Sequence, residues 1–291
     1  MNTPLIVGVD GSDASLQAVD WAVVEAIRHD VPLLLVHGSL WERYEAVRPD
    51  FGKAPSSGHV MAEHIVASAA ERVARIAPSV KATTELAASD PAMALLRAGE
   101  GAFAIVVGTR GRGAITGMLL GSTSLEVAAY ATCPVIVVRG EPANVGGECG
   151  RVAVGVGGPG ESAAAVEFAF REAQVREADL LAVHAWHRPA RELPATAHLS
   201  GDGSDHEVHD AERALGAAVL ATAQAYPKVT VKTQVPEGRA HNALLAAGTS
   251  SDLLVVGARR PRGGIGMQLG LANHTVLHHA GCPVAVVPQR T

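Results

Sequence analysis

The chain has 291 residues, of which 48% are apolar, 18% charged and 3% aromatic. This much aliphatic material excludes a chain that is disordered throughout, and the length suits two domains of ordinary size. The formal net charge is −5 and the pI is about 6.2. General nucleic-acid binders usually carry a basic excess. We therefore expect an α/β protein of two domains that takes no nucleic acid as a partner.

The first half of the chain alternates short aliphatic runs with segments of helical periodicity. Runs of this kind separated by helices predict a parallel sheet that is covered on both faces. In chain order we expect a strand at residues 5–9, a helix at 12–29, a strand at 33–36, a helix at 63–76, a weaker strand at about 80–86, a helix at 92–99, a strand at 104–107, a helix at 122–130 and a strand at 135–138.

The second half of the chain repeats the first. Residues 5–9 (LIVGV) recur 147 positions later as residues 152–156 (VAVGV). Residues 108–138 and 257–287 align without gaps at an offset of 149, with 13 of 31 positions identical. A period of this length is too long for a solenoid unit, so it indicates a duplicated domain.

The duplication predicts two tandem, doubly wound α/β domains, each with a five-stranded parallel sheet. We place the first domain at residues 1–140 and the second at residues 150–291, with a linker at residues 141–149. The residues around this linker are rich in glycine and include a proline, which favours turns over further secondary structure.

Cysteine usage and the absence of long apolar stretches point to the cytoplasm. Cys133, Cys149 and Cys282 are odd in number and form no CxxC pair, which favours a reducing compartment over a disulfide scaffold. No basic segment precedes the short apolar run near Met1, so we do not expect a signal peptide. No strongly apolar stretch approaches the ~20 residues of a bilayer-spanning helix, so we expect no membrane partner.

Candidate ligand-binding residues follow the predicted strands, because parallel sheets bind ligands at the carboxyl ends of their strands, where the strand order reverses. Asp10 follows the first strand and is suited to accept hydrogen bonds from ribose hydroxyl groups. A glycine-rich segment at residues 108–113, with Arg110 as counter-charge, leads to hydroxyl residues at 122–124. Glycines let backbone N–H groups approach an anion, and a helix N-terminus favours negative charge. The alternative is a glycine-rich loop without a ligand, in which Ser122 only caps the helix.

The glycine spacing is that of a known family. Gly108, Gly111, Gly121 and Ser122 follow the pattern Gly, two residues, Gly, nine residues, Gly, then Ser, Thr or Asn. With the opening strand that ends at Asp10, this pattern resembles the universal stress protein family. The resemblance covers essentially the whole chain as two tandem copies.

The resemblance implies a Rossmann-like fold, similar to that of adenine nucleotide alpha hydrolases, that binds ATP with Mg²⁺. It also implies a regulatory role in stress response or growth control, with no catalytic residue. The two halves would pair through their last strands, 135–138 and 284–287, as an internal pseudo-dimer, and chains would form homodimers. Alternatives are a slow ATPase or nucleotidyl-transfer enzyme on this fold, and an interaction module without ligand. The implied nucleotide-binding residues are Val9, Asp10, Gly38, Val107, Gly108, Arg110, Gly111, Gly113, Gly121, Ser122, Thr123 and Ser124.

The second half departs from the family pattern at three positions. Gly157 replaces the aspartate, Arg260 replaces the second glycine, and Leu271 replaces the serine. We therefore expect the second half to bind nucleotide weakly or not at all. A formal GxGxxG at residues 155–160 has no carboxylate after the next strand, which argues against NAD.

Histidines are numerous, 13 in all. His274 and His278 are four residues apart on a predicted helix, but no HExxH-type glutamate lies between them. We expect solvated surface histidines and no metal site.

Overall fold

The computed structural model describes residues 3–40, 57–109, 120–158, 161–186, 202–259 and 269–289. The first half contains β1 (Leu5–Gly8), α1 (Asp13–His29), β2 (Leu33–Gly38), α3 (Ser57–Ile76), β3 (Ala82–Ala87), α4 (Pro91–Ala98), β4 (Ala104–Gly108), α5 (Ser122–Tyr130) and β5 (Val135–Val138). The helix α6 (Pro142–Gly146) follows. The second half contains β6 (Arg151–Gly155), α7 (Ala163–Val175), β7 (Asp179–Val183), α8 (Asp202–Ala223), β8 (Val231–Gln234), α9 (Ala240–Gly248), β9 (Leu253–Arg259), α10 (Leu271–His279) and β10 (Val284–Gln289).

The described strands form one ten-stranded sheet in the order β3-β2-β1-β4-β5-β10-β9-β6-β7-β8. Neighbouring strands are parallel except β5 and β10, which are antiparallel, with Val284 opposite Val137 and Val286 opposite Val135. Each half is thus a five-stranded, doubly wound unit, and the expected pairing of the two last strands is confirmed. The strand order reverses between β1 and β4 and again between β6 and β9, so each half has one such point.

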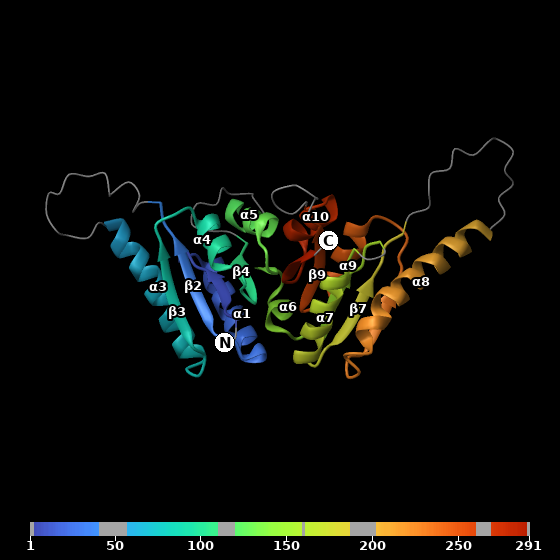
Figure 1. Cartoon of the computed structure of the whole chain (residues 1–291), viewed down its shortest axis with the longest axis horizontal. Helices are drawn as coiled ribbons and strands as arrows, with labels where there is room; N and C mark the ends of the chain where they lie inside the picture. Colours follow the sequence, from blue (N-terminus) through green and yellow to red (C-terminus); the bar gives the residue numbers. More distant parts are fainter. Residues whose placement is uncertain are drawn as a thin grey trace.

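Helices cover both faces of the sheet, and the two halves lie side by side with α3 and α8 at the outer ends (Figure 1). The strand side chains alternate between the faces: Leu5 and Val7 pack on one side with α1, α3, α7 and α8, and Ile6 packs on the other with α4, α5, α9 and α10. The apolar core on each face continues across the pairing of β5 with β10. On β5, Ile136 belongs to the core on the α1 face and Val135 to the core on the α4 face. The halves therefore share their hydrophobic cores.

The linker corrects the expectation of turns alone, because residues 142–146 form the short helix α6. Pro142 stands in its first turn, where a missing N–H is tolerated, and Gly147 ends it in the left-handed conformation at φ 80°. Asn144 is buried, and its Nδ2 donates to the carbonyl of Ser251 at 2.8 Å. This side chain fixes the linker against the second half.

Arg139 also ties the two halves together. It follows β5, and its Nε donates to the carbonyl of Ala280 at 2.9 Å, while Nη1 donates to the carbonyl of Leu277. These carbonyls belong to the end of α10, where helix carbonyl groups lack intrahelical partners and a cation is favoured. The end of the first half thus caps a helix of the second.

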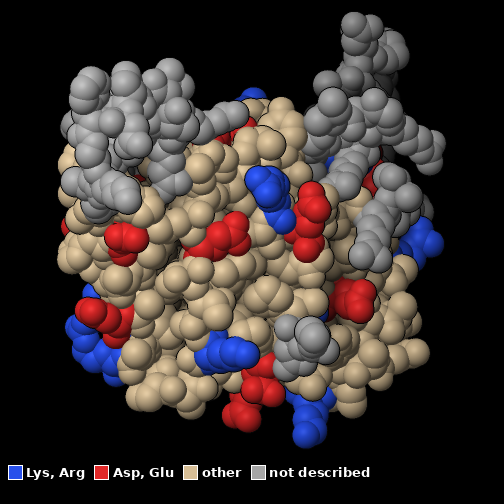
Figure 2. Space-filling model, turned by 60° about the vertical axis from the view of Figure 1, so that its left-hand side comes forward, with Lys and Arg blue, Asp and Glu red and all other residues tan. Residues whose placement is uncertain are grey.

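The surface carries charges of both signs. On the face shown in Figure 2, acidic and basic side chains are interspersed among uncharged residues. Within the described ranges, no helix has the length and apolar character that crossing a bilayer requires.

Candidate functional site

Asp10 lies just past β1, at the carboxyl edge of the sheet where the strand order reverses. Its Oδ1 accepts hydrogen bonds from Ser12 N at 3.0 Å and Ser12 Oγ at 2.6 Å. Ser12 is the N-cap of α1, and its Oγ accepts from the N–H of Ser15 at 3.2 Å. The turn before α1 therefore holds the half-buried Asp10 carboxylate at this edge.

The end of β4 lies against the start of α1. A Cβ atom at Gly108 would lie 2.4 Å from the carbonyl oxygen of Ala14, so only glycine allows this approach without a shift of the backbone. The carbonyl of Gly108 accepts from Ser124 Oγ at 2.7 Å, and Gly121 N donates to the carbonyl of Thr109 at 2.7 Å. The starts of α1 and α5 and the end of β4 thus meet at one place.

The start of α5 differs in one detail from the alternative in which Ser122 only caps this helix. Gly121 is the N-cap, with φ −73° and ψ 153°, and Ser122 is the first helical residue, so Ser122 does not cap the helix. Ser122 is exposed and Thr123 is half-buried, whereas Ser124 is buried and donates its hydroxyl proton to Gly108. Ser122 and Thr123 are therefore the more accessible hydroxyl groups of the first turn.

The remaining expected site residues support this edge. Val9 and Val107 are buried, and the carbonyl of Val9 lies 2.7 Å from His37 Nδ1. Gly38 ends β2, where a Cβ atom would lie 2.6 Å from Pro91 Cα. Three further expected residues lie outside the described residues: Arg110, Gly111 and Gly113.

The second half presents a different carboxylate at the equivalent edge. Gly157 stands where Asp10 stands in the first half, and Glu161 reaches back towards it from the start of the next helix. A Cβ atom at Gly157 would lie 3.1 Å from Glu161 Oε2. The same oxygen accepts from Gly158 N at 3.1 Å and pairs with Arg259 at the end of β9. Arg259 is the counterpart of Arg110 at the 149-residue offset.

The start of α10 lacks the hydroxyl group of α5. Leu271 is the first residue of this helix and is 76% exposed. Asn273 Nδ2 donates to the carbonyl of Gly257 at 2.8 Å, the contact that Ser124 makes with Gly108. The tie between helix and strand is kept, while the outward-facing hydroxyl group is lost.

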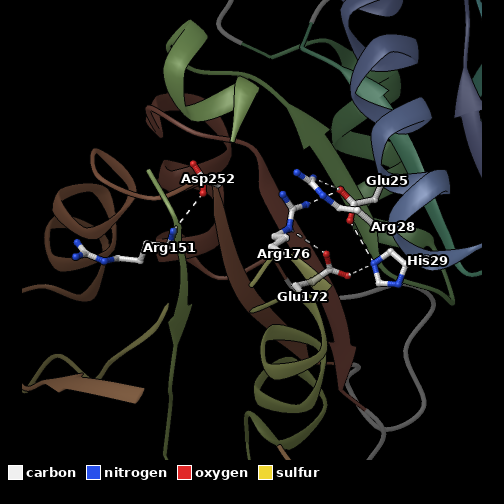
Figure 3. A network of polar contacts seen from close by, with 7 residues as sticks. All are labelled: Glu25, Arg28, His29, Arg151, Glu172, Arg176 and Asp252. Atoms are coloured by element: carbon white, nitrogen blue, oxygen red, sulfur yellow. Dashed lines mark hydrogen bonds and ion pairs between the residues drawn. The ribbon is translucent and has the colours of Figure 1, made fainter. Parts of the chain in front are cut away.

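A buried ionic network that was not predicted from the local sequence pattern joins α1 and α7 (Figure 3). Arg176 Nη2 lies 2.5 Å from Glu25 Oε2, and His29 Nε2 lies 3.1 Å from Glu172 Oε1 and 3.2 Å from Glu25 Oε1. Glu172 and Arg176 are the counterparts of Glu25 and His29 at the 147-residue offset. An acid followed four residues later by a base, in both copies of one helix, is the signal that could have revealed the network.

The network shifts the ionisation of its members. Burial disfavours the Glu25 carboxylate, but Arg176 and the contact with His29 outweigh it and lower its pKa to about 2. Burial also disfavours the charged imidazole of His29, but Glu172 and Glu25 raise its pKa to about 9. The pKa of Glu172 is raised, because this carboxyl group is buried beside the charged Glu25. The proton of His29 therefore adds positive charge beside the two glutamates, in addition to that of Arg176.

Comparisons with known proteins agree with this architecture. The model of the universal stress protein family matches residues 1–139 and 149–288. A universal stress protein from Mycolicibacterium smegmatis is 32% identical over 299 residues, covering 98% of this chain and 97% of its own. Universal stress protein Rv2623 from Mycobacterium tuberculosis is 30% identical over 303 residues, covering 97% and 95%. The crystal structure of a universal stress protein from Archaeoglobus fulgidus has a TM-score of 0.69 at 19% identity, covering 99% and 98%. The chain therefore belongs to the universal stress protein family, with one copy of the family domain in each half.

Proposed function

We propose that the first half binds ATP with Mg²⁺ and that the protein is a regulator of stress response or growth. In this proposal, bound nucleotide shifts the loop after β4 and the surface through which the domains pair. This shift alters the binding of a protein partner. In this proposal the protein acts in the cytoplasm and forms a homodimer. The observation that carries it is the convergence of Asp10, the end of β4 and the start of α5 where the strand order reverses.

Each part of this edge suits one part of a nucleotide. Asp10 provides a carboxylate that can accept from ribose hydroxyl groups, held in place by Ser12. The N-terminus of α5 and the hydroxyl groups of Ser122 and Thr123 suit the phosphates, because free N–H groups and the helix dipole favour anions. The backbone at Gly38 would face the adenine. Arg110, Gly111 and Gly113 would complete the phosphate contacts.

The second half, in the same proposal, binds nucleotide weakly or not at all. Gly157 offers no carboxylate of its own, and Leu271 offers no hydroxyl group. The Glu161 carboxylate pairs with Arg259, the counterpart of Arg110, and this carboxylate would repel a phosphate. Both differences lower the affinity for an anionic ligand.

Mass spectrometry of the ligand released by heat from the purified protein tests the first half. We expect an adenine nucleotide, and calorimetry with ATP and Mg²⁺ should then give one tight site per chain. Asp10→Asn keeps an oxygen that can accept from Ser12 but removes the charge, so it should weaken ATP binding at least about tenfold, the effect of losing a charged hydrogen bond.

The matched control is Asp13→Asn, which removes the same charge from an exposed position in the first turn of α1 and should leave the affinity unchanged. Absence of bound adenine nucleotide, together with no thermal shift on addition of ATP and Mg²⁺, contradicts the proposal. Two equal tight sites per chain would contradict only the proposed difference in nucleotide affinity between the halves.

A further inference from the structure

The network between α1 and α7 gathers three ligand atoms of the kinds that bind transition metals. One ligand atom from each of Glu25, His29 and Glu172 lies within 4.8 Å of the other two. Both glutamates are fully buried, and the His29 side chain is 5% exposed. The two halves of the chain thus contribute to one small, protected group of donors (Figure 3).

Arg176 orients both carboxylates so that one oxygen of each faces His29. Its guanidinium group pairs with Glu25 Oε2 at 2.5 Å and with Glu172 Oε2 at 3.4 Å. This leaves the two Oε1 atoms on the side of the imidazole. A cation that binds the far oxygen of a metal-bound carboxylate is a common way to orient such ligands.

The three atoms are close together, but none of them has a hydrogen-bond partner of acceptable direction among the described residues. His29 Nε2 lies 3.1 Å from Glu172 Oε1 and 3.2 Å from Glu25 Oε1, so distance is not the reason. Buried polar atoms without a hydrogen-bond partner are unusual, and here three of them lie together and contact one another as ion pairs.

The separations of His29 Nε2 from Glu172 Oε1 and Glu25 Oε1, 3.1 and 3.2 Å, are close to the edge of a tetrahedral metal site. With ligand bonds of 2.0–2.1 Å, as zinc makes to imidazole nitrogen and carboxylate oxygen, neighbouring ligand atoms lie about 3.3 Å apart. Imidazole with carboxylate suits Zn²⁺ and related transition metals, whereas Mg²⁺ prefers oxygen ligands alone.

We propose that Glu25, His29 and Glu172 form a divalent transition-metal site, with Zn²⁺ as the expected ion, that fastens the first half of the chain to the second. In this proposal the metal lies among these three atoms and replaces the ion pairs that His29 makes with the two glutamates. Arg176 holds the two carboxylates, and Arg28, on the more exposed side, approaches Glu25 Oε2 at 3.5 Å. The occupant that competes with the metal is the proton on His29.

The test uses the full chain, freed of metal with EDTA, and Zn²⁺ as the probe. Calorimetry should find one tight equivalent of Zn²⁺ per chain, and Zn²⁺ should raise the melting temperature. His29→Arg is the decisive variant, because it keeps a base at this position, as Arg176 does in the second copy, but cannot ligate a metal. We expect its affinity for Zn²⁺ to fall about 100-fold or more, with loss of the thermal shift.

Two control variants address zinc bound by surface histidines. His59→Arg alters an exposed pair with Glu63, and His274→Arg alters a histidine stacked on His278 at 4.5 Å between ring centres. Both should keep the tight site. An unchanged response in His29→Arg, or its loss in either control, overturns the proposal. So does wild-type protein that does not respond to Zn²⁺, because the His29 proton then fills this place.

Glu172→Gln provides a second variant if His29→Arg does not fold, and it should also weaken Zn²⁺ binding about 100-fold. Independently of any variant, Co²⁺ bound to the wild-type protein should show the intense visible absorption of a tetrahedral site. The weak absorption of six-coordinate Co²⁺ overturns the proposal.

Discussion

The two halves close the carboxyl ends of their strands with the same ties but offer a ligand different groups. In both halves a histidine Nδ1 lies close to the carbonyl that follows the first strand: His37 at 2.7 Å in the first and His184 at 2.9 Å in the second. A serine at the start of the next helix also accepts a hydrogen bond from the backbone after that strand in both copies. Asp10 N donates to Ser15 Oγ at 3.4 Å, and Gly157 N donates to Ser162 Oγ at 2.7 Å. The scaffold of the edge is therefore duplicated.

The differences between the halves fall on groups that the scaffold does not need. Asn273 replaces Ser124 without loss of the tie to the strand, because either side chain supplies a donor. Gly157 replaces Asp10, and the Glu161 carboxylate, from the segment just before α7, lies beside it. The fold tolerates any residue that keeps its internal hydrogen bonds, whereas a ligand site requires particular charges. Sequence divergence therefore removes charged and hydroxyl groups from this edge without altering the fold.

The largest expected effect is at the contact between the halves, where the two copies differ by a histidine and an arginine. Arg176→Met leaves Glu25 and Glu172 buried without their main cation. Removing one partner of a buried ion pair typically costs about 3–5 kcal/mol, so the free energy of unfolding should fall by that amount. Chemical denaturation of the full chain measures it.

The matched control for this change is Arg213→Met on α8, because Arg213 pairs with Asp210 where both side chains are mostly exposed. Exposed pairs contribute about 0–1 kcal/mol, so this variant should be close to wild type. Equal losses in the two variants would show that the buried network does not hold the halves together.

A smaller effect compares two equivalent glycines at the carboxyl edges. A Cβ atom at Gly108 would meet the backbone of Ala14 at 2.4 Å, whereas one at Gly257 would meet the side-chain Nε2 of Gln289 at 2.8 Å. Backbone cannot easily move, but the end of a glutamine side chain can. Gly108→Ala should therefore cost about 1–3 kcal/mol, the range for overpacking, and Gly257→Ala less.

Thermal unfolding of the two glycine variants measures this difference, and far-UV circular dichroism confirms that both remain folded. The reverse order of stability would mean that the Gln289 side chain yields less easily than the backbone at Ala14. The comparison thus tests a difference in packing between two edges with the same connectivity.

Local pattern was enough to predict most of the fold. Aliphatic runs such as Val135–Val138 marked the strands, and the internal repeat gave the two halves. Periodicity failed where a helix end is exposed: α3 begins at Ser57, six residues before the expected start at Glu63, and Val60 and Met61 in this added stretch are exposed. A helix turn that buries few apolar side chains leaves no periodic signal.

The parts of the site that could not be predicted depend on contacts between distant segments. Asp10 was identified because it directly follows a strand. Glu161 was not, because its closeness to Gly157 and Arg259 arises from the path of the chain between β6 and α7. The network around Glu25 leaves a signal, an acid and a base four residues apart in both copies, but the contact of one copy with the other depends on the strand order that brings α1 beside α7.

The smallest expected difference between the halves is at two equivalent thiols. Burial raises the pKa of Cys133 to about 11 and that of Cys282 to about 12. At pH 8 the reactive thiolate is then on the order of one part in a thousand or less, and both thiols are shielded. Cys149, in the linker, is only partly buried. Iodoacetamide should therefore label Cys149 first, as peptide mass spectrometry can show.

Cys133 and Cys282 should become labelled together, and only when the chain unfolds, because their strands lie in one sheet and their side chains in one shared core. Cys149→Ser is the control and should leave no rapidly labelled thiol. Early labelling of one buried thiol without the other would mean that the halves open independently. In that case the shared core and the buried network would be too weak to make the two copies unfold as one unit.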